Sequence, residues 1–331
     1  MTAPPKKKDG EIIFLAEIVQ AYNFKILVEL LQSNLKMVNF YVHPNKITLR
    51  ESDEKHEYLG DLNLSTELFK FKLNLDLVDP EKKECKYFKI GVNIGHVHLV
   101  TKTIKKKDVL TLFVTTDSRK ELFFKIENKP KEKCSIKRVR IINVKERKWE
   151  LPKYDSLPNA IMNSSEFQKV GKNMSAITKT IHVSIQSEGI KFSADSDSIV
   201  PTDDFAGTWI EDAEIIHKDI FSKQKFAQLA KHSGLSSDNQ MRFYAKKSLN
   251  PIRIATKVGS MGDYSSYVMA DVEEEDNENG EDPESDEDTE ENKEDTEDSN
   301  TEELETPDAE ENKEDKEITE KPKKKKIIII R

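Results

Sequence analysis

The segment from Leu157 to Asp195 constrains the fold of this chain most, because it holds a complete pattern of strand, helix and two strands. Asn163 or Ser164 is expected to cap the helix, and Glu166 supplies an acid in its first turn. At about 100° per residue the helix has one apolar face and one lysine-bearing face. The residues on these faces are Phe167, Val170, Gly171, Met174 and Ile177 against Lys169, Lys172 and Ala176.

After this helix, residues 182–186 and 190–194 alternate between apolar and polar as half-buried strands do, around a tight turn at 187–189. The same pattern of a strand, a helix and several strands occurs four times. The other helices are expected over 21–35, 93–104 and 218–232. Such repeats are structural units that close their cores only by packing together, so we expect two similar domains of two units each.

The boundaries follow from changes in composition. We expect a disordered N-terminus (1–10), a first domain (11–145), a connector (146–156), a second domain (157–272) and a disordered acidic tail with a basic end (273–331). The connector is charged but contains Trp149, Leu151 and Tyr154. Large apolar side chains are seldom exposed in a linker without being used.

The charge is unevenly distributed. Residues 271–331 contain 28 acidic and 9 basic side chains, a net charge of −19, whereas residues 1–270 carry +10. A tail this poor in apolar residues cannot bury enough surface to fold. A basic folded region followed by an acidic tail is expected of a protein that binds a polyanion, because the tail can compete with that polyanion for the basic residues. A charge of +10 would also simply keep a domain soluble.

Signals for catalysis are missing from the sequence. It contains no Gly-rich phosphate loop, no GxSxG and no HExxH, and its seven histidines are scattered. We therefore expect no enzyme activity, no cofactor and no metal. The two cysteines, Cys85 and Cys134, lack metal-like spacing, which suggests free thiols in a reducing compartment. No apolar run approaches the roughly 20 residues of a membrane span, so no membrane partner is expected.

Several short sequence segments, in the same order along the chain, resemble segments of one protein family. The run SSEFQKVGKNMSAI…IHVSIQSEGIKFSAD is similar to the start of the second domain of the eukaryotic-type DNA sliding clamp, the proliferating cell nuclear antigen (PCNA) family. Residues 250–254 and 260–270 resemble that family's last two strands, and residues 18–20 and 91–94 match words of its first half. The resemblance spans roughly residues 11 to 272.

The resemblance implies an α+β DNA clamp fold. In this fold two similar domains place antiparallel sheets outside and four helices inside a ring. Cations on those helices would face double-stranded DNA, where lysine attracts phosphates without reading sequence and so permits sliding. A charged outer face is also the usual way to solvate a surface helix. The candidate DNA-binding residues are Lys25, Lys102, Lys105, Lys169, Lys172, Lys223, Lys225 and Lys231.

The first helix departs from the family, because only Lys25 is basic there and Ile26 and Gln32 stand where further lysines are common. The loop Lys105–Lys107 is expected to compensate.

The resemblance also implies an apolar pocket under the connector that takes short peptides of client proteins, anchoring aromatic side chains. The matching positions are His56, Leu59, Trp149, Leu151, Pro152, Pro251, Tyr267, Met269 and Ala270. Alternatively, Pro251 and Tyr267 simply pack the last strands. Ser52 and Glu57 are more polar than is usual in the family, so peptide preference is expected to differ.

Ring closure would pair the edge strands of neighbouring subunits, expected at Glu121–Ile126 and roughly Gly207–Asp212. The implied function is a homotrimeric processivity factor for DNA polymerase and other replication and repair proteins, placed on DNA by a clamp loader. Alternatives are a subunit of a heteromeric checkpoint-type clamp, a monomeric viral processivity factor, or an acidic-tailed chaperone of basic nuclear proteins. The expected location is the nucleus, or a cytoplasmic replication site if the chain is viral.

Overall fold

The computed structural model describes residues 10–78, 85–128, 133–196, 199–247 and 249–271, all within one compact unit. Residues 1–9 and the acidic tail from residue 272, for which disorder is expected, lie outside the described residues. The predicted division into two domains therefore concerns two halves of one compact unit, and its boundaries remain a prediction.

The first half begins with strand β1 and helix α1 and contains two strand–helix–strands repeats. Its strands and helices are β1 (Ile12–Ile18), α1 (Ala21–Asn34), β2 (Met37–Val42), β3 (Lys46–Ser52), β4 (Tyr58–Ser65), β5 (Lys70–Leu73), β6 (Phe88–Asn93), α2 (Ile94–Thr101), β7 (Val109–Thr115), β8 (Glu121–Asn128) and β9 (Lys133–Arg140).

The second half repeats the pattern twice more. It contains β10 (Ala160–Asn163), α3 (Ser164–Ile177), β11 (Thr180–Ile185), β12 (Gly189–Ser196), β13 (Ile199–Gly207), β14 (His217–Ser222), α4 (Lys223–Ala230), β15 (Gln240–Lys246), β16 (Leu249–Lys257) and β17 (Gly262–Val268). A short 3₁₀ turn, Lys231–Gly234, continues α4.

Three antiparallel sheets hold these strands, in the orders β5-β1-β7-β8-β9, β10-β15-β16-β17-β4-β3-β2-β6 and β13-β12-β11-β14. The eight-stranded sheet joins the two halves, because β17 pairs with β4 from Val268 opposite Tyr58 to Gly262 opposite Leu64. Behind this seam the buried hydroxyls of Tyr58 and Tyr264 contact each other. The halves are thus connected by backbone hydrogen bonds as well as by the chain.

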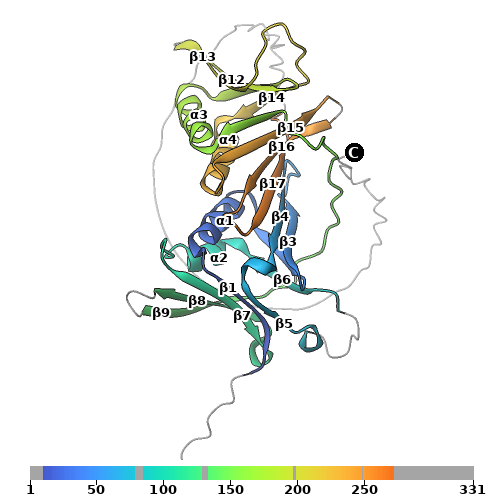
Figure 1. The fold of residues 1–331 in the computed structure, drawn as a ribbon, viewed down its shortest axis with the longest axis vertical. Helices are drawn as coiled ribbons and strands as arrows, with labels where there is room; N and C mark the ends of the chain where they lie inside the picture. Colours follow the sequence, from blue (N-terminus) through green and yellow to red (C-terminus); the bar gives the residue numbers. More distant parts are fainter. Residues whose placement is uncertain (1–9, 79–84, 129–132, 197–198, 248, 272–331) are drawn as a thin grey trace, which may run out of the picture. The chain divides into compact units, whose positions relative to one another are not determined.

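The four helices form a row, α2-α1-α4-α3, in which each helix contacts the next (Figure 1). Each buries its apolar stripe, as the sequence predicts; Phe167, Val170, Gly171 and Met174 of α3 are all buried. A Cβ on Gly171 would lie 2.5 Å from the Cβ of Ala230, so glycine permits the close approach of α3 to α4. None of the helices in the described part of the chain is long and apolar enough to cross a membrane.

The connector between the halves, residues 141–159, contains no helix or strand and crosses the eight-stranded sheet. The Ile142 amide donates to the carbonyl oxygen of Gly91 at its start, and the Asn159 amide donates to that of Phe243 at its end. Between them, a guanidinium nitrogen of Arg50 lies 3.4 Å from the Trp149 carbonyl oxygen. The connector therefore lies against the sheet along its length.

Two expectations about secondary structure are wrong. The last helix begins at Lys223 and not near 218, because residues 217–222 form β14, whose Asp219 and Phe221 are buried while Lys218 is exposed. Ser222 then caps α4 by accepting the amide of Lys225. The strand β13 was not predicted, since its sequence IVPTDDFAG carries a proline and two acids that are unusual in strands.

Candidate functional sites

Six of the eight candidate DNA-binding lysines are exposed, on the faces of the helices opposite their buried stripes or just after a helix end. They are Lys102, Lys105, Lys169, Lys172, Lys223 and Lys231. Because neighbouring helices contact one another and each buries its other face, these cations belong to one layer of the molecule. Lys231 connects the two halves, since its Nζ donates to Oγ of Ser33 on α1 at 2.8 Å.

Helix α3 presents its cations most openly. Asn163 is the N-cap, and its side chain accepts the amide of Ser165, which resolves the choice between Asn163 and Ser164. Lys169 and Lys172 are exposed, and neither has an ion pair with another described residue. Their charges are thus available to an external anion.

Helix α1 presents its cation differently. The Lys25 side chain is only 18% exposed and its Nζ lies 3.8 Å from Glu29 one turn away. The Nζ atoms of Lys25 and Lys106 also lie 5.5 and 5.9 Å from the centre of the Tyr22 ring. Lys106 of the 105–107 loop thus lies next to α1, and compensation by this loop stays a prediction.

Lys225 was predicted to face DNA, but the structure places it in an internal ion-pair network. Its side chain is 12% exposed, and Nζ lies 2.9 Å from Asp271 and 3.4 Å from Glu57. Contact with Lys225 and with the Ser222 amide holds the pKa of Asp271 below its usual value, although burial opposes this. With two carboxylates beside it, Lys225 is unsuited to bind phosphate and instead ties α4 to β4 and to the end of β17.

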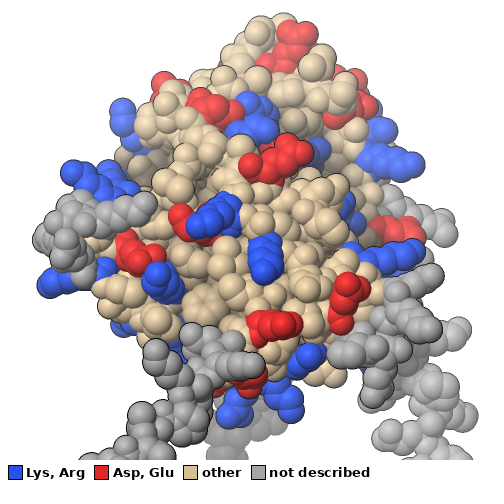
Figure 2. Space-filling view, turned by 60° about the horizontal axis from the view of Figure 1, so that its bottom comes forward, with Lys and Arg blue, Asp and Glu red and all other residues tan. Residues whose placement is uncertain are grey.

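The distribution of charge on one face of the molecule can be compared with this layer. Figure 2 shows one face, on which lysines and arginines are interspersed with aspartates and glutamates. That face carries no large field of one sign.

Tyr154 of the connector covers part of the surface predicted to bind peptides. Pro152, Pro251 and Tyr267 are buried, and Leu59 is 2% exposed. Tyr154 of the connector lies over this area: its hydroxyl donates to the Pro251 carbonyl oxygen at 2.5 Å, and its ring centre is 6.0 Å from that of Tyr267. Burial raises the pKa of both tyrosines. The sequence marked Tyr154 as a large connector side chain but gave no sign that it covers the pocket.

The other end of this surface is formed by the 53–56 turn and Trp149. The His56 ring centre lies 5.2 Å from that of Trp149. His56 has φ 63°, a conformation that non-glycine residues seldom adopt. Asp53 stabilises the turn by accepting the amides of Glu57 and Tyr58 at 2.9 and 3.0 Å. His56 and Trp149 are thereby brought together, whereas Leu59 lies opposite Tyr267 in the sheet. Leu151, Met269 and Ala270 are half-buried.

The sheet edges differ from the expectation. β8, which contains Glu121–Ile126, is not an edge, because β7 and β9 pair with its two sides. The edges of that sheet are β5 and β9. In the second half the edges of the four-stranded sheet are β13 and β14, and the predicted segment 207–212 begins where β13 ends. In the first half the error arose because the sheet carries one further strand, β9, beyond β8.

Comparisons with known proteins agree with this architecture. Residues 152–271 match the family model "Proliferating cell nuclear antigen, C-terminal domain". The proliferating cell nuclear antigen of Dictyostelium discoideum is 25% identical over 198 residues, covering 58% of this chain and 73% of that protein. Proliferating cell nuclear antigen 2 of Drosophila melanogaster is 23% identical over 183 residues, covering 55% and 67%.

The fold is also similar to a solved structure. The crystal structure of proliferating cellular nuclear antigen from Entamoeba histolytica superposes with a TM-score of 0.64 at 19% identity, covering 79% of this chain and all of that one. At this identity the likeness shows the fold alone, and it confirms the predicted α+β clamp fold. The second half of the chain is thus similar to the C-terminal domain of the proliferating cell nuclear antigen, and the described chain has the fold of that sliding clamp.

Proposed function

We propose that this chain is the subunit of a ring that encloses duplex DNA and tethers DNA polymerase and other replication and repair proteins to it, as a non-enzymatic processivity factor. The observation that carries the proposal is the continuous row of four helices whose exposed faces hold Lys102, Lys169, Lys172, Lys223 and Lys231. Lysines contact phosphates without reading bases and release counterions on binding, so such a surface would bind any sequence.

We further propose that the ring closes by pairing β9 of one subunit with β13 of the next, most simply as a homotrimer. Both are free edges in the chain. Their charges are complementary: β9 contains four cations and no acid, whereas the described side chains of β13 include Asp204 and also Asp203, which binds Lys191 at 2.9 Å within the chain. Opposite charges on the two edges favour head-to-tail contact between copies of one chain over a heteromeric clamp.

The test combines mass with DNA topology. Mass photometry of the full chain should give particles of about three chains. Loaded particles should remain on nicked circular DNA and slide off after linearisation, because retention would depend on enclosure and not on affinity. A monomer would indicate the viral type of processivity factor, and equal retention on linear DNA would contradict an enclosing ring. Binding to histone-like proteins without any DNA retention would favour the chaperone alternative.

Client peptides would bind at the surface formed by His56, Leu59 and Trp149 and by Pro251, Tyr267 and their neighbours. Because Tyr154 occupies the Pro251–Tyr267 end, a client would displace it or extend over it. Replacing Tyr267 with Ala should remove binding of the polymerase's clamp-binding peptide in a pull-down while leaving the particle mass unchanged. A nuclear location, a clamp loader as the partner that opens the ring, and regulation by the acidic tail belong to the same proposal.

A further inference from the structure

A second groove, separate from the apolar pocket, lies between the outward face of β2, β3 and β4 and the first half of the connector. It has a volume of about 440 Å³. Most of the side chains that line it are cationic or can donate hydrogen bonds, so the groove is suited to a polar ligand and not to an apolar one. The lining residues are Tyr41, Lys46, Thr48, Arg50, Asp61, Leu62, Asn63, Arg147, Lys148 and Trp149.

The floor of the groove follows from strand alternation. On β3, Ile47 and Leu49 are buried in the core, so Lys46, Thr48 and Arg50 face outward. The register places Tyr41, Thr48 and Asn63 opposite one another on three neighbouring strands. A phenol, an alcohol and an amide, each able to donate a hydrogen bond, therefore form one row.

The charges of the groove are strongly unbalanced. Lys46, Arg50, Arg147 and Lys148 face a single acid, Asp61, and Arg50 already binds that carboxylate at 2.9 Å. Glu146, the acid next to Arg147, pairs with Lys89 at 3.3 Å. Within the described part of the chain, neither Lys46 nor Lys148 has a carboxylate partner. The groove thus has positive charge that the chain does not neutralise.

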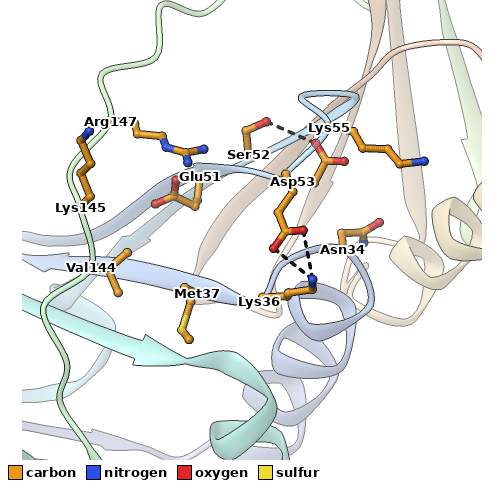
Figure 3. Close-up of a pocket in the computed structure, with 11 residues that line it drawn as sticks. Asn34, Lys36, Met37, Glu51, Ser52, Asp53, Lys55, Val144, Lys145 and Arg147 are labelled. Carbon is orange, nitrogen blue, oxygen red and sulfur yellow. Dashed lines mark hydrogen bonds and ion pairs between the residues drawn. The ribbon is translucent and has the colours of Figure 1, made fainter. Parts of the chain in front are cut away.

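A neighbouring pocket on the other side of the connector has a more balanced set of charges. This pocket, of about 380 Å³, also contains four cations, but it has three acids (Figure 3). Lys36 binds Glu54 at 3.0 Å, Glu51 lies beside Arg147, and Asp53 accepts backbone amides. Three acids thus offset four cations in this pocket, whereas the outward groove has one acid for four cations and therefore the larger excess of positive charge.

The groove is continuous with the client-peptide surface through Trp149. Trp149 lines the groove, and its ring packs against His56. A peptide anchored at His56 and Leu59 could therefore continue past Trp149 onto Lys148, Arg50 and Lys46 without leaving the protein surface.

We propose that this groove binds an acidic segment, rich in Glu and Asp, that flanks the apolar anchor of a client peptide. The proposal rests on the proposed function in that a client docks beside Trp149. Carboxylates would be attracted by Lys46 and Lys148 and oriented by donors from Tyr41, Thr48 and Asn63. Specificity would then come from two adjacent surfaces, one apolar and one cationic, and would weaken with salt.

The experiment uses Trp149 as a local reporter. The chain contains two tryptophans, so Trp209→Phe in the full chain leaves Trp149 as the only one. The probe is the peptide acetyl-Glu₇-amide, and acetyl-Gln₇-amide is the neutral control. We expect a saturable change in Trp149 fluorescence with the Glu₇ peptide that is lost at high salt, and no change with the Gln₇ peptide.

Charge reversal tests the site. Lys46→Glu/Lys148→Glu should weaken Glu₇ binding about tenfold, because both changes turn an exposed attractive contact with the peptide into a repulsive one. Lys72→Glu/Lys120→Glu, two exposed lysines outside the groove, should leave it within about twofold, as should Lys169→Glu/Lys172→Glu on α3. Equal weakening by all three pairs, or no response to Glu₇, would overturn the proposal.

Two further outcomes are distinguishable. If a phosphoserine peptide or a single-stranded oligonucleotide of equal charge bound this groove more tightly than Glu₇, the acidic-peptide assignment would be wrong. Retention on circular DNA, measured with the same Lys46→Glu/Lys148→Glu protein, should equal that of the parent chain. Failure of the Glu₇ response with normal retention overturns the groove alone. Loss of retention in the parent chain overturns the clamp function.

Discussion

The two halves of the molecule repeat one pattern, yet they present their cations differently. In the first half, Lys25 lies against Glu29 and the Tyr22 ring, and the exposed candidate lysines Lys102 and Lys105 lie at the end of α2 and in the following loop. In the second half, the candidate lysines Lys169, Lys172, Lys223 and Lys231 are all exposed, and Lys225 is held by acids.

The comparison shows that the position of a lysine on a helix does not decide whether its charge is available. Lys25 and Lys169 both lie opposite an apolar stripe. The difference is the residue one turn away, Glu29 in α1 and Asn173 in α3, because oppositely charged residues four apart attract each other. If the layer binds DNA, the second half should therefore supply most of the affinity.

The largest expected effect comes from reversing the open charges of α3. Lys169→Glu/Lys172→Glu should lower affinity for a short duplex about 100-fold near 0.1 M salt and reduce the slope of log K against log salt by about 2, because two phosphate contacts are lost. Fluorescence anisotropy over a salt series measures both quantities. The matched control is Lys218→Glu/Lys246→Glu, exposed lysines on strands of the same half, and an equal loss there would contradict a localised surface.

A smaller effect concerns stability where the second half meets the first. His232 is fully buried, and its Nδ1 lies 2.8 Å from the Leu229 carbonyl oxygen. Burial lowers the pKa of His232 from 6.5 to about 4. The unfolded chain thus takes up a proton below pH 6.5 that the folded chain refuses, so stability falls as the pH drops from 6.5 toward 4.

Between pH 7 and pH 5 this group should cost about 2 kcal/mol of unfolding free energy. Urea unfolding at several pH values measures the loss. The variant His232→Leu should show a flatter profile over the same range, and identical profiles for both proteins would assign the pH dependence to other groups.

Lys225 separates stability from DNA binding. Lys225→Met keeps the aliphatic stem but leaves Asp271 and Glu57 without their cation, which should lower the unfolding free energy by about 1–2 kcal/mol. Duplex affinity should stay within about twofold, since the charge is internally neutralised. A loss of affinity as large as that from α3 would restore Lys225 to the DNA-binding set.

The smallest effect tests the first half directly. Glu29→Gln removes the acid beside Lys25 and should raise duplex affinity by about twofold or less, the size expected of one exposed pair four residues apart. The gain should vanish in the double variant Glu29→Gln/Lys25→Gln. A lower affinity in Glu29→Gln would mean that the pair orders the surface more than it masks it.

Local pattern predicted the helices and most strands because a helix or strand that buries one face must repeat apolar residues with its own period. It failed at His217–Ser222, where six residues are too few to separate the strand period from the start of the next helix. It also failed at β13, whose residues are held in a strand by pairing with β12 and not by their own propensity.

By itself, the sequence determined the repeated units, the buried stripes, the exposed lysines of α3 and the large side chains of the connector. Only the tertiary structure decided that Lys225 is neutralised by Glu57 and Asp271, that Tyr154 covers Pro251, and that Lys46 and Lys148 border one groove. The physical reason is the separation along the sequence between the residues that interact. Periodicity records what each residue does to its own element, whereas charge pairing and cavity shape depend on residues up to 168 positions apart, brought together only by packing.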